Sequence, residues 1–316
     1  MKRKKIISSG TGRRVIAFIF TALVITAFFS CETTAPYMGS MAQIGATIGQ
    51  ATGLINESTA DAIIKSGVAF GAAFEEITPE QEYYIGRAVA ANVLTSYRLQ
   101  PTSSSMTSYV NKIANALIIN SPRPEIFSGY HVAILDSDEI NAFATPGGHI
   151  FITRGLINCA TSEDTLAAVI AHEVAHIQLQ HGLKAIKNSR FTQALLITGT
   201  SAAGAAGNAT VSELAGTFGD SVNEIVSTLV TNGYSRTQEL DADSFAMGLM
   251  SLAGYEPSSL IDMLQVLERN QGSHPGGFNN THPTPTQRIS NARNTVGNYD
   301  VPDTRSYRQA RYGAVR

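Results

Sequence analysis

Residues 168–176 read AVIAHEVAH, and this stretch decides how the rest of the chain is interpreted. Its apolar and small residues predict a buried helix. On such a helix His172 and His176 lie four positions apart and therefore on the same face. Two imidazoles so placed can bind one zinc ion, and Glu173 beside them can accept a proton from water. Because polar groups on a buried helix are costly without a partner, the pattern predicts a metal site.

A catalytic zinc ion needs a third protein ligand. A histidine six residues after His176 would supply one, but Gly182 stands there and His181 is one residue short. His181 is therefore expected on the surface or behind the ligands. Glu239 is the better candidate, because Asp243 follows four residues later and can hydrogen-bond a ligand histidine from behind. Taken alone, these two acids would also fit a solvated helix face.

The first thirty residues have the layout of a secretory signal. A basic stretch precedes the apolar run 15–29, and Ser30 and Cys31 follow it directly. This position of a cysteine resembles a bacterial lipoprotein signal, in which the cysteine becomes the lipidated first residue. Phe28 and Phe29 depart from that pattern, and the alternative is an uncleaved membrane anchor. We expect a lipid anchor on Cys31, on the periplasmic side of the bacterial cell envelope.

The charge distribution argues against a nucleic-acid partner. Six of the 23 basic residues lie in the first thirty positions, which hold no acidic residue. The rest of the chain therefore has 17 basic and 25 acidic residues, a net charge of −8. No basic stripe remains to neutralise phosphates.

The cysteine count excludes a disulfide framework if the first cysteine carries lipid. The chain has two cysteines, and lipidation of Cys31 would leave Cys159 without a partner. Cys159 is therefore expected to be a small core residue.

Capping signals and apolar periodicity predict a mostly helical chain. Thr78 with Gln81, and Thr161 with Asp164, have the spacing of capping boxes. One or two helices are expected within 38–74, and further helices over 78–99, 104–119, 161–188, 237–252 and 258–269, with a last short helix and a polar tail after them. The Ala- and Gly-rich stretch 189–233 is expected to be a helical excursion.

Three short stretches predict strands. Residues 130–135 and 141–144 are expected to pair with each other, and 149–153 to follow a Pro-Gly-Gly turn. The fold class is therefore α+β, predominantly helical, with a small antiparallel sheet. The strand over 148–153 is expected at the sheet edge, where it would either hold an extended substrate by backbone pairing or be purely structural.

The chain resembles peptidase family M forty-eight, which includes the HtpX, CAAX-prenyl-protease and mitochondrial Oma-type metallopeptidases. The resemblance spans about 75–292 and rests on four ordered motifs, namely NAFA-x-PGGHIF over 141–151, the histidine helix, Arg236 with Glu239 and Asp243, and THP over 281–283 with Arg288. It implies a zincin-type domain with its sheet packed on the active-site helix.

The same resemblance implies roles for single residues. Glu239 is implied as the third zinc ligand with Asp243 as its supporting partner, and His282 and Arg288 are implied near the metal. By the same resemblance His282 and Arg288 are candidates to help the developing oxyanion, whereas His282 could instead block the metal or merely cap a turn. Unlike the integral-membrane members, this chain has no spanning helix predicted after residue 30, and no helical-repeat domain is expected after Arg288. The short, lipoprotein-like periplasmic members are the better match.

These observations predict four segments and one activity. The segments are a signal peptide over 1–30, an N-terminal helical segment over 31–74, a zinc metallopeptidase domain over 75–298 and a polar C-terminal tail over 299–316. The expected activity is hydrolysis of misfolded or misassembled envelope proteins with one zinc ion per chain. The alternatives are a non-catalytic zinc-stabilised chaperone or assembly factor, in which Glu173 would have no task, and a zinc hydrolase acting on cell-wall peptides.

Overall fold

The chain divides into two compact units. One unit comprises residues 1–76 and 187–217, and the other comprises residues 77–186 and 218–316. The computed structural model describes residues 38–51, parts of 53–68, 77–185 apart from residue 103, 226–227, 233–270, 281–282 and 285–316.

The first unit is helical where the structure describes it. Helix α2 spans Met38–Ala51, and several residues between 57 and 65 are also helical, which confirms the helices expected there. Across the described part of the chain, no helix has the length and apolar character needed to cross a membrane. The predicted signal segment 1–30, Cys31 and most of 189–233 lie outside the described residues.

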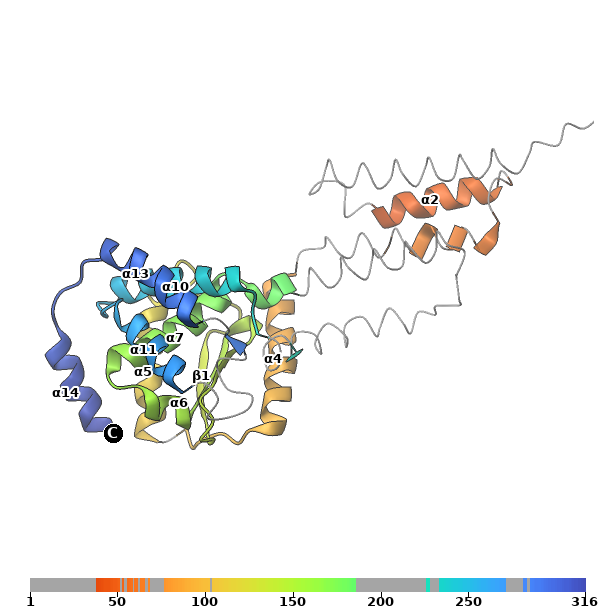
Figure 1. Ribbon diagram of the computed structural model, residues 1–316. Coiled ribbons are helices and arrows are strands. Elements are labelled where there is room, and N and C mark those ends of the chain that lie inside the picture. The colour runs from red at the N-terminus through yellow and green to blue at the C-terminus, as the bar shows by residue number, and fades with distance from the viewer. Residues whose placement is uncertain are drawn as a thin grey trace, which may run out of the picture. The chain divides into compact units, whose positions relative to one another are not determined.

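In the second unit, helices surround a small sheet, and α7 lies among α5, α10 and α11 (Figure 1). The helices are α4 Pro79–Ser96, α5 Ser105–Ile118, α6 Arg154–Cys159, α7 Glu163–Gln178, α10 Arg236–Leu252, α11 Ser259–Arg269, α13 Pro285–Thr295 and α14 Arg305–Val315, with short 3-10 turns η2 Pro146–Gly148 and η4 Val296–Asn298. The helices expected from residues 78, 104, 237 and 258 are confirmed, although α4 ends at Ser96, three residues early.

The sheet differs from the prediction in two respects. Strands β1 (His131–Leu135), β2 (Ala142–Ala144) and β3 (His149–Thr153) lie in the order β1-β3-β2. β2 is antiparallel to β3, whereas β1 is parallel to it, so the sheet is mixed and 130–135 does not pair with 141–144. The tight turn η2 brings β3 back alongside β2, and β1 then takes the other side of β3. The expected edge position of 148–153 was therefore wrong, since β3 is central.

Helix α7 carries the histidine motif, and its boundaries differ from those expected. Ser162 is the N-cap: its Oγ accepts from Thr165 N at 3.1 Å, and Thr165 Oγ1 accepts from Ser162 N at 3.0 Å. The capping box predicted for Thr161 and Asp164 was thus wrong by one residue at each end. The helix ends at Gln178, not near residue 188, because the chain turns sharply through Gln180, whose φ is 55°.

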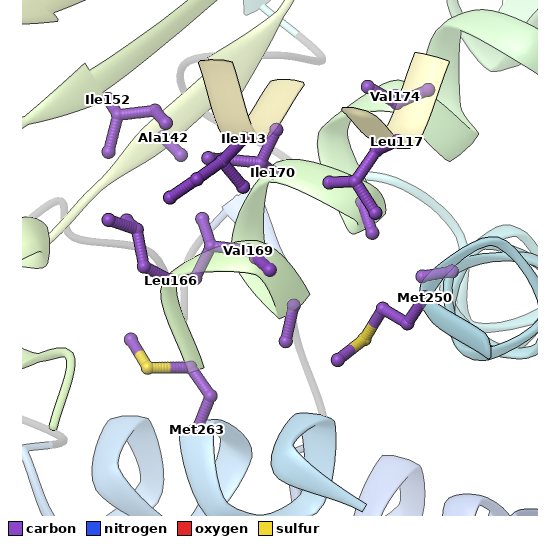
Figure 2. Packing of buried hydrophobic residues seen from close by; sticks show 14 of the residues in the cluster. Ile113, Leu117, Ala142, Ile152, Leu166, Val169, Ile170, Val174, Met250 and Met263 are labelled. Carbon is purple, nitrogen blue, oxygen red and sulfur yellow. The ribbon is translucent and has the colours of Figure 1, made fainter. Parts of the chain in front are cut away.

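The main hydrophobic core encloses α7 (Figure 2). Its side chains pack against α5, the sheet, α10 and α11, each of which contributes apolar residues. The labelled residues are Leu166, Val169, Ile170 and Val174 of α7, Ile113 and Leu117 of α5, Ala142 and Ile152 of the sheet, Met250 of α10 and Met263 of α11. Because packed interiors resist displacement, the helix that carries the histidines is held rigidly.

Helix α4 holds the turn between β2 and β3. It begins with the predicted capping box, in which Thr78 Oγ1 accepts from Gln81 N and Gln81 Oε1 accepts from Thr78 N. Gly86 lets η2 approach, since a Cβ there would lie only 1.6 Å from the carbonyl oxygen of Pro146. The end of β2 is therefore fixed against α4 by backbone contact.

The C-terminal segment 299–316, expected to be a polar tail, contains α14 (dark blue in Figure 1). Arg308 and Tyr312 of α14 are buried, and Tyr312 Oη donates to Ala160 O at 2.9 Å. Cys159, just before Ala160, is a free cysteine that packs partly buried against the main core, as predicted.

Candidate metal centre

Helix α7 places two imidazoles within contact of each other. His172 and His176 are one turn apart, with ring centroids 4.7 Å apart and Nε2 atoms 3.1 Å apart. Both side chains are buried in a helix whose other buried residues are mostly Ala, Val, Leu and Ile. Their Nε2 atoms face one point, as the joint binding of one metal ion would require.

Helix α10 brings a carboxylate to the same point. Glu239 Oε2 lies 3.4 Å from His172 Nε2, and Glu239 Oε1 lies 3.5 Å from His176 Nε2. Ser235 caps this helix and Glu239 follows in its first turn. Burial opposes ionisation of Glu239, yet the neighbouring His282 and Arg288 side chains hold its pKa well below the usual range.

A third histidine completes the cluster from another part of the chain. His282 Nδ1 lies 3.0 Å from Glu239 Oε1 and 3.2 Å from His172 Nε2. The four residues His172, His176, Glu239 and His282 each offer one donor atom, and these atoms lie within 4.8 Å of one another. Within the described ranges this is the one group of three or more such residues that could hold a metal ion.

An ion pair supports His172 from behind. Asp243 Oδ1 lies 3.0 Å from His172 Nδ1, on the side of the ring away from the cluster. Arg288 holds Asp243 with two hydrogen bonds, Nε to Oδ2 at 2.8 Å and Nη2 to Oδ1 at 2.7 Å. Arg288 Nη1 also lies 2.9 Å from Glu239 Oε2. The arginine thus fixes two carboxylates and, through Asp243, the orientation of His172.

Glu173 lies beside the cluster and is fully buried. Neither of its carboxylate oxygens has a hydrogen-bond partner among the described residues, and His282 Nε2 is 3.5 Å from Oε1. Burial raises the pKa of Glu173 above its ordinary value. An unpartnered buried carboxylate is costly, so its presence here favours a chemical role over a structural one.

Two contacts of His176 could not be predicted from residue spacing. His181 is buried, and its Nδ1 lies 2.8 Å from His176 Nδ1, so it stands behind the ligand candidate and not on the surface. Tyr234 stacks on His176, with centroids 4.0 Å apart and planes inclined by 14°. No periodic or motif signal marks Tyr234. For His181, the one available signal in the sequence is its position as a polar residue just outside the histidine motif.

The charges of the site fit a divalent cation. Three buried carboxylates, Glu173, Glu239 and Asp243, face one buried guanidinium, Arg288. Three negative charges against one positive charge leave a deficit of two positive charges when all four groups are ionised. Imidazole and carboxylate are common ligands of zinc, and two histidines with one glutamate form a known catalytic ligand set. The residues present therefore fit a zinc ion.

Comparison with curated proteins finds relatives that are proteases by name, two of them metalloproteases. The chain is 26% identical over 223 residues to the beta-barrel assembly-enhancing protease of Yersinia pestis, covering 67% of this chain and 43% of that protein. It is 27% identical over 199 residues to the metalloprotease LoiP of Escherichia coli strain K12, covering 63% and 73%. It is 26% identical over 220 residues to the mitochondrial metalloendopeptidase OMA1 of Schizosaccharomyces pombe, covering 68% and 61%.

The match to a family model covers the whole metal centre. The chain spans less than half the length of the beta-barrel assembly-enhancing proteases of Yersinia pestis and Escherichia coli strain K12, 43% and 38% respectively. The model of Peptidase family M48, by contrast, matches residues 104–296, which include α7 and α10, the two helices that carry candidate ligands, and Arg288. The chain therefore belongs to Peptidase family M48.

Proposed function

We propose that this protein is a zinc-dependent endopeptidase of the bacterial cell envelope, which hydrolyses misfolded or misassembled envelope proteins. The observation that carries the proposal is the convergence of His172, His176 and Glu239 on one point, with the unpartnered carboxylate of Glu173 beside it. Family membership supports peptide-bond hydrolysis. The name of the Yersinia pestis and Escherichia coli beta-barrel assembly-enhancing proteases, which refers to β-barrel assembly, supports a substrate in the envelope.

The side chains divide the work of hydrolysis. His172, His176 and Glu239 would hold the zinc ion, which when bound supplies Lewis-acid chemistry that activates water and polarises a carbonyl. Glu173 accepts a proton from the attacking water and returns it to the leaving amine. Arg288 is engaged with Asp243 and Glu239, which favours a role in holding these carboxylates over direct contact with the substrate.

Strand β2 is a better candidate than β3 to bind an extended substrate, because β3 is paired on both sides within the sheet. β2 lies at the end of the sheet order, and Asn141, just before it, contacts Thr281 next to His282. An added strand pairs through backbone groups and so reads extended conformation more than side-chain identity. Such binding would suit a peptidase that selects unfolded segments.

The location is part of the proposal. The basic, apolar and cysteine-ended layout of residues 1–31 supports export and a lipid anchor on Cys31. The partners would then be a membrane, through that anchor, and unfolded or misassembled envelope proteins. The acidic remainder of the chain gives no support to a nucleic-acid partner.

Metal analysis combined with casein digestion tests the proposal. The purified chain should hold about one zinc ion and digest casein. Glu173→Gln should keep the zinc and lose at least about a hundredfold in rate, because it removes the proton acceptor and not a ligand. His172→Ala, His176→Ala or Glu239→Ala should weaken zinc binding as well. Glu125→Gln, a change of the same kind at an exposed position, serves as the control.

Three results would count against the proposal. Casein digestion by Glu173→Gln at the rate of the unaltered protein would refute the mechanism. Zinc binding with suppression of aggregation but no cleavage would favour a chaperone. Cleavage of cell-wall peptides in preference to casein would favour the other zinc hydrolase.

A further inference from the structure

The two α7 histidines are supported by different chemical groups. His172 has a carboxylate behind it, Asp243, whereas His176 has a neutral ring in that place, His181. The two rings of His176 and His181 are inclined by 69°, with centroids 4.9 Å apart. His181 is 1% exposed, so this contact is not made by a mobile surface side chain.

The backbone is bent so that His181 reaches His176. On an unbroken helix, a residue five positions on would lie about 140° around the axis and could not face the first. Here α7 stops at Gln178, and Gln180 adopts a φ of 55° before a new helical turn starts at His181. A positive φ is uncommon for a residue other than glycine and carries a conformational cost. The bend therefore needs a compensating interaction, and the contact between the histidines is one.

The hydrogen bond between the two rings determines the state of His176. A neutral imidazole that offers Nε2 to a metal carries its proton on Nδ1. The two Nδ1 atoms are 2.8 Å apart, and only one of them can hold the shared proton. If His176 donates it, His181 must accept through Nδ1 and carry its own proton on Nε2. That Nε2 has no hydrogen-bond partner among the described residues.

We propose that His181 is the positioning residue for His176, accepting the Nδ1 proton of His176 and so leaving Nε2 free for the metal. The proposal rests on the proposed zinc site and adds a residue to it. A purely structural role explains the geometry less well, because a buried apolar side chain would fill the same space without leaving a polar atom unpartnered. Tyr234, stacked on the face of His176, completes the restraint on the ring.

Three substitutions of His181 separate an acceptor from a space-filling role. His181→Leu keeps most of the volume and removes the acceptor. His181→Asn places its amide oxygen close to where Nδ1 was, whereas the longer His181→Gln places its amide near the former Nε2. His131→Gln is the matched control, since His131 is an exposed histidine in β1. Zinc affinity is measured on the full chain by competition with a fluorescent chelator, and thermal unfolding is measured on the metal-free proteins.

The expected order of zinc affinity is specific to the proposal. His181→Leu and His181→Gln should bind zinc about ten- to a hundredfold more weakly, the usual effect of losing a supporting partner of a ligand histidine. His181→Asn should recover most of the affinity, and His131→Gln should match the unaltered protein. Metal-free stability should not follow this order.

Two outcomes would overturn the inference. Unchanged affinity in His181→Leu would show that His176 needs no acceptor there. Equal weakening in His181→Asn and His181→Leu would show that the ring acts only by packing. If the unaltered protein itself takes up no zinc, the proposed function fails first, so the two failures are distinguishable.

Discussion

At the scale of single residues, the side chains of the candidate metal centre are almost completely buried. His172, Glu173, His176, Glu239 and His282 are each at most 2% exposed. His282 reaches the cluster from a segment whose backbone is tied down, since Tyr234 N donates to Thr281 O at 3.1 Å. A catalytic zinc site needs an open position, whereas four protein ligands are typical of a structural site. With His282 included, the cluster offers four protein donors, the number typical of a structural zinc site.

The position of His282 leads to a prediction about latency. If His282 occupies the fourth position, His282→Ala should raise casein cleavage. Should the blocked form account for about nine-tenths of the molecules, turnover would rise about tenfold. If His282 instead assists the developing oxyanion, the same substitution should lower turnover. Initial rates on casein, with zinc content measured in parallel, distinguish the two roles.

Thr286→Ala, in helix α13, is the control for this comparison, because Thr286 bonds Glu268 on the exposed side of that helix. A clear fall in the turnover of His282→Ala with full zinc content would rule out blocking. No change would mean that His282 has neither role.

Much of the site follows from spacing, and the exceptions have a common cause. Helical spacing predicted that His172 and His176 share a face, and likewise Glu239 and Asp243, because residues four apart on one helix must do so. The contacts of Tyr234 and His181 with His176 do not follow from helical spacing. Tyr234 reaches His176 through a loop, and His181 does so only because the chain turns at Gln180. Contacts that depend on loop geometry leave no periodic signal.

At the scale of elements, helix α7 is held at its N-terminal end by the C-terminal helix. Asp164 in the first turn of α7 is 3% exposed, and Arg308 of α14 lies 2.9 Å from it. Asp164 Oδ1 also accepts from Glu256 N at 2.9 Å, in the connection between α10 and α11. Arg308 Nη1 donates to Gly254 O at 2.9 Å in the same connection. One buried ion pair therefore joins α7, α14 and the end of α10.

Removing one partner of this ion pair should be strongly destabilising. Arg308→Met keeps most of the aliphatic stem but leaves Asp164 buried without its counter-charge, which typically costs about 3–5 kcal/mol of the free energy of unfolding. Urea unfolding of the metal-free chain measures this loss.

Arg305→Met is the matched control, because Arg305 pairs with Glu256 while 66% exposed. Exposed pairs contribute about 1 kcal/mol or less. Similar losses in the two variants would show that the buried pair does not anchor α14.

Helices could be predicted from the sequence where the residues that determine their ends lie close together in the chain. The cap at Thr78 and the helix starting after Ser104 follow from residues within one turn. The order of the strands does not, because β1 can pair with either later strand and the choice depends on tertiary packing. The local pattern places Asp164 in a capping box, although its partner Arg308 lies 144 positions away. Long-range pairs of this kind cannot be inferred from a local pattern.

At the scale of the whole molecule, the division into units leaves the metal centre within one unit. The second unit begins at Ile77, close to the expected start of the peptidase domain at residue 75, and holds all the proposed ligands. The other unit contains residues 1–76, and therefore the predicted signal and Cys31. Attachment to a membrane and hydrolysis are thus expected to depend on different units and to be separable by mutation.

Substitution of Cys31 tests that separation. One acyl chain binds a membrane only marginally, whereas the several chains of a mature lipoprotein hold firmly. Cys31→Ser should therefore abolish labelling by a fatty-acid analogue in cells and alter processing of the N-terminal segment. The purified Cys31→Ser protein should still bind zinc and digest casein. Cys159→Ser is the matched control, since Cys159 is the chain's other cysteine and packs partly buried on the core. Equal labelling of Cys31→Ser and the unaltered protein would exclude Cys31 as the acceptor and favour an uncleaved anchor.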